Sequence, residues 1–319
     1  FRSCLDLTAL KRPMIALKYN SDTQEGFDGA VVQYSTDEGF TWETIGDNAG
    51  RGINWYRSSN LSVDIGGQDN YAWSEKDSLG WRTARYNLDQ IPVAERGKVV
   101  FRIAFGSNDD NPKTGRSLEG FAFDDIFIGE KTRTVLVEHF TNLASAPSTG
   151  AGTEFDNLFD AQNNVPGDTA DFFKIEYHIA NPGVDSLNLY NPADPSERSR
   201  YYGVSQPPAA IMDGILGPYY SKAVFNGIYS RITAEELDRR SLEDPLFDIS
   251  ITQDPGAPIN TIRADVYFTY IDSVNTLSNE VIVQLALVET DVPVDGQGTY
   301  RYVVRKLLMG TEGRRVNIL

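Results

Sequence analysis

The sequence predicts a multidomain chain of β and α/β type, and three observations support that prediction. First, its 319 residues exceed the length of one average domain. Second, residues 1–130 consist of short apolar runs between turn residues and lack an amphipathic helical pattern, which is typical of a β-sandwich or jelly roll. Third, residues 131–244 alternate strand-like and helix-like stretches, which indicates an α/β unit, before residues 245–319 return to β patterns.

The strands expected in residues 1–130 follow from period-two alternation. GAVVQYSTDEGFTWETIG (29–46) alternates for several residues and turns at residues 37–39, which is a hairpin signal. KVVFRIAFGS (98–107) and GFAFDDIFIG (120–129) are two further strand patterns bounded by glycines. All four tryptophans of the chain fall in this segment.

The α/β segment contains strand patterns at 132–141, 171–179 and 207–214. Between them, residues 153–164 carry apolar side chains at helical spacing. ADPSERSRYYGV (193–204) predicts a helix with Asp194 as its N-cap. Two more helices are expected, over 221–232 and over 233–244. Thr233 opens the second of these with a capping-box pattern.

Four strands are expected in the last segment, at 246–253, 261–271, 280–290 and 300–308. Because the chain begins at Phe1 without a methionine or a leader, we expect it to be a segment of a longer protein. No apolar run approaches the ~20 residues that span a bilayer, so no transmembrane segment is expected.

The net charge of -16 opposes binding to nucleic acid and to anionic lipid, and it favours solubility and cation binding. Cys4 is the only cysteine, so the chain cannot form an internal disulfide.

Four stretches of the first segment resemble the MAM-like jelly rolls of bacterial secreted proteases and surface proteins. They are DGAVVQYSTDEGFTWETIG (28–46), GWRTARYNL (80–88), VVFRIAFGS (99–107) and GFAFDDIFIG (120–129). The resemblance implies a non-catalytic jelly roll over residues 1–130, which serves adhesion, partner binding or packing against a neighbouring domain.

Members of that group often hold a structural cation near acidic residues at strand ends. Asp28, Asp124 and Asp125 lie at matching positions, and Glu25 is close in sequence to the first of them. Two or three carboxylates with carbonyls and water would satisfy calcium. The alternative is that Asp124 and Asp125 only cap a strand end.

The rest of the chain resembles a thioredoxin-like outer-membrane protein family of the Bacteroidota. In that family a Glu-Glu-Phe-Thr stretch leads into a redox Cys-x-x-Cys. Here EHFT (138–141) is the lead-in, and Ser145 and Ser148 stand at the positions of the two cysteines. YYGVSQPPAAIMDG (201–214) is similar to the second mark of the family, and Pro208 matches the cis proline that faces the redox pair. The resemblance implies a thioredoxin-like domain over 131–244 and an Ig-like β-sandwich over 245–319, within which we expect the given chain to end.

Serine cannot form a disulfide, so oxidoreductase activity is not expected. A serine-dependent hydrolase is an unfavoured alternative, with Ser148 beside His139 or His178, because no G-x-S-x-G elbow occurs. We expect both histidines to be hydrogen-bonded strand residues instead. A glycan-binding module is a third hypothesis, which requires that Trp55, Tyr56, Tyr71, Trp73 and Trp81 form an exposed stacking platform rather than core.

The sequence therefore predicts a non-catalytic binding or scaffold segment of a secreted protein at the bacterial cell surface. Its expected partners are proteins of the outer membrane or cell surface, with adhesion as one role. The family resemblance further implies cargo or a component of the type IX secretion and gliding motility apparatus.

Overall fold

The structure is a computed structural model in which the contacts between residues divide the chain into two compact units. Unit 1 comprises Phe1–Val135, Asn157–Phe173 and Ser230–Glu243, and unit 2 comprises Leu136–Asp156, Lys174–Tyr229 and Asp244–Leu319. The described residues are 3–58, 61–66, 71–74, 80–108, 118–162, 171–214, 232–258, 261–271 and 280–317.

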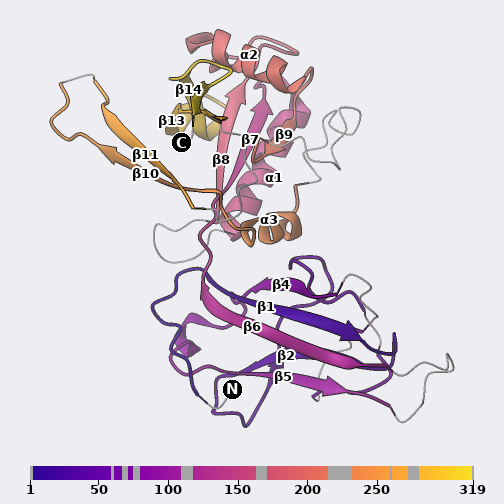
Figure 1. Cartoon of the computed structure of the whole chain (residues 1–319). Coiled ribbons are helices and arrows are strands. Elements are labelled where there is room, and N and C mark those ends of the chain that lie inside the picture. The colour runs from indigo at the N-terminus through magenta and orange to yellow at the C-terminus, as the bar shows by residue number, and fades with distance from the viewer. Residues whose placement is uncertain are drawn as a thin grey trace. The chain divides into compact units, whose positions relative to one another are not determined.

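Unit 1 contains two antiparallel three-stranded sheets (Figure 1). The first has the order β4-β1-β6, formed by Arg82–Asn87, Pro13–Asp22 and Gly120–Glu130. The second has the order β3-β2-β5, formed by Glu43–Thr44, Gly29–Ser35 and Val100–Gly106. A 3-10 helix, η1, spans Val93–Glu95. The β-rich character that the sequence predicts for this part of the chain is confirmed.

An aromatic cluster fills the core of unit 1. Trp55, Tyr56 and Trp73 are buried among aliphatic side chains from both sheets, and the ring centroids of Trp55 and Trp73 are 4.9 Å apart. The two indole N–H groups donate to the carbonyl oxygens of Ile45 (3.0 Å) and Asn54 (2.9 Å). Burial of these large side chains is favourable because their polar atoms are satisfied.

Helix α3 (Ala234–Ser241) packs within unit 1 although it follows the sheets by about a hundred residues. Its N-cap is Thr233, as predicted, and the hydroxyl oxygen accepts the N–H of Glu236 at 3.3 Å. Arg51 binds Asp238 at 2.7 Å and so ties the helix to the β-rich part of the unit. Only half of the predicted capping box forms, because the Glu236 carboxylate binds Arg239.

Unit 2 is built on a five-stranded sheet with the order β13-β14-β8-β7-β9. The strands are β7 (Val135–Thr141), β8 (Phe172–His178), β9 (Ala209–Met212), β13 (Ala286–Val294) and β14 (Gly298–Leu307). Helices α1 (Ala146–Gln162) and α2 (Ala193–Tyr202) and the 3-10 helix η2 (Asn188–Tyr190) lie between strands in the sequence. In Figure 1, β7 and β8 run side by side in the same direction.

The C-terminal strands differ from the expected separate β-sandwich over 245–319. β13 and β14 extend the sheet of β7, β8 and β9, and the remaining strands form two-stranded pairs. The pairs are β10 (Phe247–Gln253) with β11 (Ala264–Tyr270), and β12 (Glu280–Val283) with β15 (Arg314–Asn317). The strand expected over 280–290 is therefore two strands, β12 and the start of β13, which belong to different sheets.

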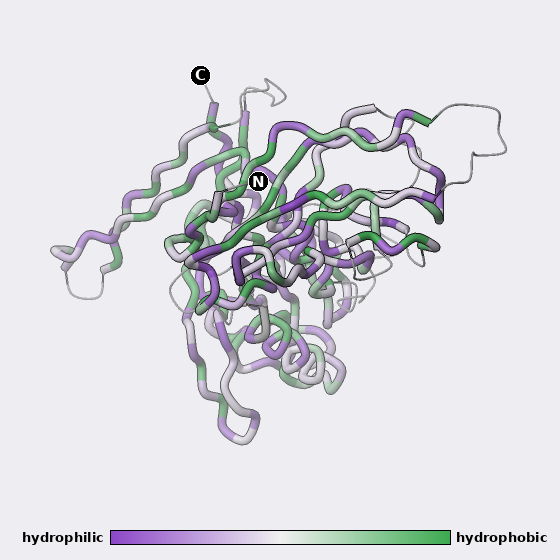
Figure 2. The backbone as a smooth tube through the Cα atoms, turned by 90° about the horizontal axis from the view of Figure 1, so that it is seen from below, coloured by the Kyte–Doolittle hydropathy of each residue, from purple (hydrophilic) through white to green (hydrophobic). Residues whose placement is uncertain are grey.

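The β10–β11 pair has one apolar face. Phe247, Ile249 and Ile251 of β10 lie opposite Tyr270, Phe268 and Val266 of β11. Residues directly opposite each other project to the same side of a sheet, so the six apolar side chains share one face. Ile249 and Ile251 are 64% and 62% exposed. Figure 2 shows this kind of alternation between hydrophobic and hydrophilic residues along the extended strands.

Two helix predictions have different outcomes. Helix α2 forms, but Asp194 is not its N-cap, because the helix begins at Ala193 and the Asp194 carboxylate accepts the N–H of Leu307 at 2.8 Å. The helix expected over 221–232 lies, except for its last residue, outside the described residues. Among the helices that the structure describes, none combines the length and the apolar character needed to cross a bilayer.

Candidate functional site

Ser145 and Ser148 lie at the start of helix α1, directly after strand β7. The backbone oxygen of Ser145 accepts the N–H of Thr149 at 3.1 Å, and its side-chain oxygen accepts the N–H of Ser148 at 3.3 Å. These two contacts make Ser145 the N-cap of α1. The Ser148 side chain points into the protein, with 0% exposure, and its hydroxyl has no hydrogen-bond partner among the described residues.

Pro208 immediately precedes strand β9, and the bond between Pro207 and Pro208 is cis. β9 pairs antiparallel with β7, with Phe140 opposite Ala209. Pro208 therefore lies at the C-terminal end of β7, the same end from which the chain enters Ser145 and α1. The fold brings the two serines and the proline to one end of the sheet.

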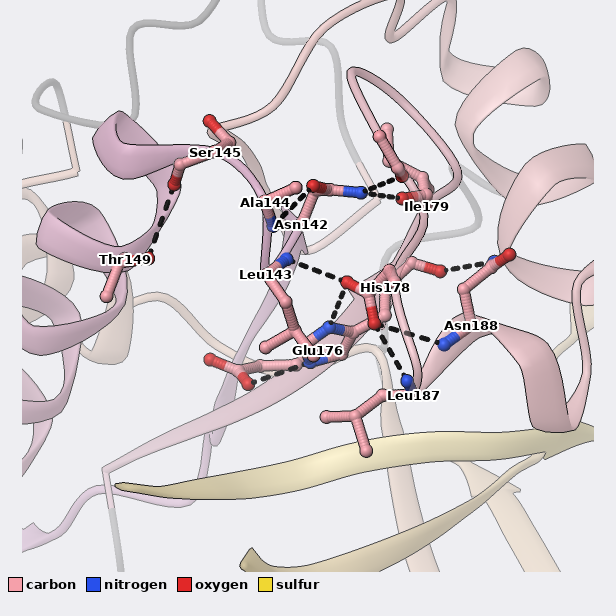
Figure 3. A network of polar contacts seen from close by, with 12 residues as sticks. Asn142, Leu143, Ala144, Ser145, Thr149, Glu176, His178, Ile179, Leu187 and Asn188 are labelled. Carbon is pink, nitrogen blue, oxygen red and sulfur yellow. Dashed lines mark hydrogen bonds and ion pairs between the residues drawn. The ribbon is translucent and has the colours of Figure 1, made fainter. Parts of the chain in front are cut away.

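A polar cluster holds the loop between β7 and α1 against the loop that follows β8 (Figure 3). The side-chain amide of Asn142 donates to the backbone oxygens of Ile179 (2.6 Å) and Gly183 (2.9 Å). The carboxylate of Asp185 accepts the backbone N–H groups of Leu143 and Leu187, both at 2.8 Å. These bonds add side-chain partners to the few backbone hydrogen bonds of the two loops, such as the one from the N–H of Ile179 to the oxygen of Thr141 at 3.0 Å.

The two histidines of the chain lie in the same cluster and are buried. His178 Nδ1 is 2.8 Å from Asp185 and its Nε2 is 3.7 Å from Glu176, whereas His139 Nδ1 is 3.3 Å from Glu176. The expectation that both are hydrogen-bonded strand residues is confirmed. Both rings are fully or almost fully covered, at 0% and 2% exposure.

The neighbours of each ring set its protonation. Burial opposes charge on His178, but Asp185 and Glu176 outweigh it and raise the pKa of His178 above its ordinary value. Burial dominates for His139 and lowers its pKa despite the bond to Glu176. Glu176 is buried as well, yet the hydrogen bond with His139, the nearby His178 ring and the charge of Lys174 hold its pKa well below the usual range.

Lys174 extends the network to helix α1. Its ammonium group lies 2.8 Å from Glu176 and also binds Asp156 of α1, and its side chain is 1% exposed. Burial works against the charge on Lys174, but the two carboxylates raise its pKa. Lys174, Glu176 and His178 alternate along β8 and therefore lie on one face of the strand.

A second buried network centres on Glu138 of β7. Its carboxylate accepts hydrogen bonds from Arg198 (2.8 Å), from the Tyr177 hydroxyl (3.0 Å) and from the Tyr202 hydroxyl. In the sequence, Glu138 is recognisable only as part of the lead-in to the serines, and no local pattern points to Arg198 as its partner. The paired charges on β7 and α2 anchor that helix to the sheet.

The chemical groups of these clusters are already occupied or enclosed. Each histidine binds a carboxylate, the Lys174 ammonium binds two, and Ser148 is covered by protein. Cys4, the only thiol, is exposed in unit 1 and has no second thiol to pair with. The arrangement can stabilise the sheet and its loops by charge pairing, and within these clusters Ser148 and the two histidines are covered by protein.

The three aspartates predicted for calcium each make local contacts. Asp28 accepts the backbone N–H groups of Gln24 (3.3 Å) and Asn108 (3.1 Å). Asp125 binds Lys18 at 2.7 Å, and Asp124 accepts the N–H of Asp125 at 2.8 Å. Glu25 is exposed. Within the described residues, no three His, Cys, Asp or Glu side chains are placed to hold a metal ion.

The aromatic residues considered for a glycan platform are mostly core residues. Trp55, Tyr56 and Trp73 are buried and Tyr71 packs against the same core, whereas Trp81 is exposed. A stacking platform requires several exposed aromatic faces, so these residues do not form one. They are buried because their rings pack on one another between the two sheets.

Comparison with family models, with curated proteins and with solved structures finds no match to this chain.

Proposed function

We propose that this chain is a non-catalytic binding and scaffold segment of an exported cell-surface protein of Bacteroidota type. In this proposal unit 1 contributes a MAM-like jelly roll, and unit 2 contributes a thioredoxin-like domain whose redox position holds serines. The role is to present surfaces to protein partners outside the cell.

The order and placement of the elements in unit 2 support the thioredoxin-like assignment. Strand β7, helix α1 and strand β8 follow one another, with β7 and β8 adjacent in the sheet, and β9 pairs with the other side of β7. Ser145 and Ser148 lie at the N-terminus of α1, and Pro208 lies at the same end of β7. A redox pair at a helix N-terminus gains from the helix dipole, whereas a serine at that position gains from capping.

The observation that carries the non-catalytic proposal is the burial of every candidate catalytic group. Ser148, His139 and His178 are each at most 2% exposed. A substrate would have to displace packed side chains and break the contacts of Asp185 and Glu176 before it reached them. The hydroxyl of Ser145 is engaged as a helix cap.

Exposed apolar side chains support a binding role. The apolar face of the β10–β11 pair exposes Ile249 and Ile251, and the segment around η2 exposes Leu189 and Tyr190. Exposed apolar groups gathered on one face mark interaction surfaces more often than isolated ones do. The association with type IX secretion or gliding rests on family resemblance alone.

The proposal is tested by affinity capture with the immobilised full chain and a solubilised outer-membrane fraction of a Bacteroidota bacterium. We expect saturable retention of a protein partner, equal with and without dithiothreitol and unchanged in the Ser148→Ala variant. Two enzymatic assays serve as the counter-test, one for insulin disulfide reduction and one for ester hydrolysis. Turnover by the wild type that is lost in Ser148→Ala would contradict the proposal.

A further inference from the structure

A cavity of about 720 Å³ opens beside the end of strand β13 in unit 2. Its lining comes from the segment after Asp185 and from the end of β13 with the turn that follows: Ser186, Leu187, Leu189, Tyr190, Val292, Pro293, Val294, Asp295 and Gln297. The volume lies within the range of pockets that bind small ligands. This cavity is called the β13 groove below.

The floor of the groove is rigid and apolar. Leu187 and Val292 are buried and pack with Val303 of β14 in one cluster. Figure 3 shows Leu187 beside the pale yellow C-terminal strands, below the polar cluster. Asp185 fixes the backbone of Leu187 at 2.8 Å, so the floor is held by the same carboxylate that binds His178.

The wall of the groove is apolar but exposed. Leu189 is 67% exposed and Tyr190 is 76% exposed. The Arg305 guanidinium lies over the Tyr190 ring, 4.8 Å from the ring centroid, and this contact holds the ring in place. Two large apolar side chains are thus kept at the surface around a preformed hollow, which favours a docking role over core packing.

Among the described strands, the one beside the groove is an edge strand of its sheet. β13 is the last strand of the five-stranded sheet and pairs, among the described strands, only with β14. An edge strand offers N–H and C=O groups to which another extended chain can be added. Pro293 lacks an N–H, so backbone pairing there is limited to the neighbouring residues and the cavity is left to recognise a side chain.

The charge at the groove is negative. Asp295 lines it and forms no ion pair in the part of the chain that the structure describes. Arg305, the nearby cation, is neutralised by Glu289 at 2.7 Å. A ligand with a positive side chain next to an apolar one complements both features, and the net charge of -16 attracts such a ligand over longer distances.

We infer that the β13 groove binds an extended, basic peptide segment of a protein partner, which adds a strand to β13 and places one aliphatic side chain in the cavity. This inference rests on the proposed binding function and names the surface and the chemistry of the partner.

The test uses the full chain and a fluorescein-labelled heptapeptide probe, Ac-Lys-Val-Lys-Leu-Lys-Val-Lys-NH2, with fluorescence anisotropy as the readout. We expect saturable binding that is about tenfold weaker in Val294→Asp, which puts a charge into the cavity, and about tenfold weaker in Asp295→Lys. The matched control is Val93→Asp, at an exposed valine of η1 in unit 1, which should bind like the wild type.

Two further probes separate the parts of the inference. A heptapeptide with glutamate in place of lysine should bind wild type poorly and Asp295→Lys better. A lysine peptide with N-methylated backbone amides should bind weakly, because it cannot add a strand. Circular dichroism of each variant reports whether it folds. If Val294→Asp unfolds, Asp295→Lys, at the rim of the groove, provides the test of binding.

The inference is overturned if no probe binds the wild type up to about 1 mM, or if Val294→Asp and Asp295→Lys both bind like the wild type. The failure of the site and that of the proposed function are distinguishable. A chain that captures an outer-membrane protein but ignores the peptides, and whose Val294→Asp variant captures equally well, refutes the groove and leaves the binding function standing.

Discussion

Glu138 and Arg198 show how single buried charges determine the stability of unit 2. Their atoms lie 2.8 Å apart with side-chain exposures of 2% and 6%, and two tyrosine hydroxyls donate to the same carboxylate. Removal of one partner leaves the other charge buried without compensation. The pair therefore holds helix α2 against strand β7.

Glu138→Ala is expected to lower the free energy of unfolding by about 3–5 kcal/mol, measured by urea denaturation. The control is Glu280→Ala, which removes the exposed contact between Glu280 and Arg315 (3.0 Å) and should cost no more than about 1 kcal/mol. Equal losses in the two variants would show that the Glu138 pair has no special role.

His178 predicts a pH dependence whose sign follows from its raised pKa. The folded state keeps the proton on His178 to higher pH than the unfolded state, whose pKa is near the ordinary value of 6.5. The groups that face it are Asp185, Glu176, Tyr300, Lys174 and His139. The stability contributed by the charge is fully present below about pH 6.5 and is lost as pH rises through the folded-state pKa.

The excess stability of the wild type over His178→Asn is expected to be larger near pH 6 than near pH 9, measured by urea titration at each pH. His139→Asn is the opposing control. Because the pKa of His139 is lowered, its contribution is present above about pH 6.5 and is lost as pH falls. The same trend in both variants would contradict the assignment of a charged His178 and a neutral His139.

The sequence predicts the environment of the two histidines but not their partners, and it does not predict the roles of Lys174 and Glu176. The pattern of β8 places Lys174, Glu176 and His178 on one strand face, and such a row of titratable residues is a signal that could have indicated pairing on burial. Asp156, Asp185 and Arg198 come from α1, from a loop and from α2. Only the tertiary fold brings those segments to the strand.

At the scale of the elements, both serines lie at the start of helix α1. Ser145 caps the helix, and Ser148 occupies its first turn with an enclosed hydroxyl. Loss of a cap leaves backbone N–H groups at the helix start without a partner. Loss of a buried hydroxyl that has no partner removes a group whose desolvation is uncompensated.

Ser145→Ala is expected to lower the free energy of unfolding by about 1 kcal/mol, whereas Ser148→Ala is expected to be neutral or stabilising. Urea denaturation of the two alanine variants, which differ only in position, provides the comparison. If Ser148→Ala lowers the free energy of unfolding as much as Ser145→Ala or more, the Ser148 hydroxyl has a hydrogen-bond partner. Its role as a possible nucleophile would then have to be tested.

Local patterns predict elements better than they predict which sheet an element joins. The alternation in 246–253 and 261–271 predicts β10 and β11 correctly, and Thr233 correctly predicts the start of α3. The run over 280–290 is apolar from Val281 to Val288 except at Gln284, and one polar residue does not by itself indicate the break between β12 and β13. Sheet membership depends on long-range pairing, such as that of β14 with β8.

At the scale of the whole molecule, the net charge of -16 favours cation binding, and calcium is the cation predicted. The calcium prediction depends on Asp28, whose carboxylate lies near the N–H of Asn108. A site occupied at about 100 times its Kd adds about 2.7 kcal/mol to the folded state, so EDTA should lower the Tm by several degrees. Asp28→Asn should abolish that difference. An unchanged Tm of the wild type in EDTA contradicts a bound calcium.

We propose above that unit 2 keeps the redox position of a thioredoxin-like domain, and the structure shows Ser145 of that position as a helix cap. The direct test restores the thiols with Ser145→Cys and Ser148→Cys together, in a Cys4→Ser background, and titrates the disulfide against a glutathione buffer with mass spectrometry as the readout. Residues three apart at a helix start lie within disulfide range. We expect a reversible intramolecular disulfide with a defined reduction potential. Two thiols that remain reduced in a folded protein under oxidised glutathione would contradict it.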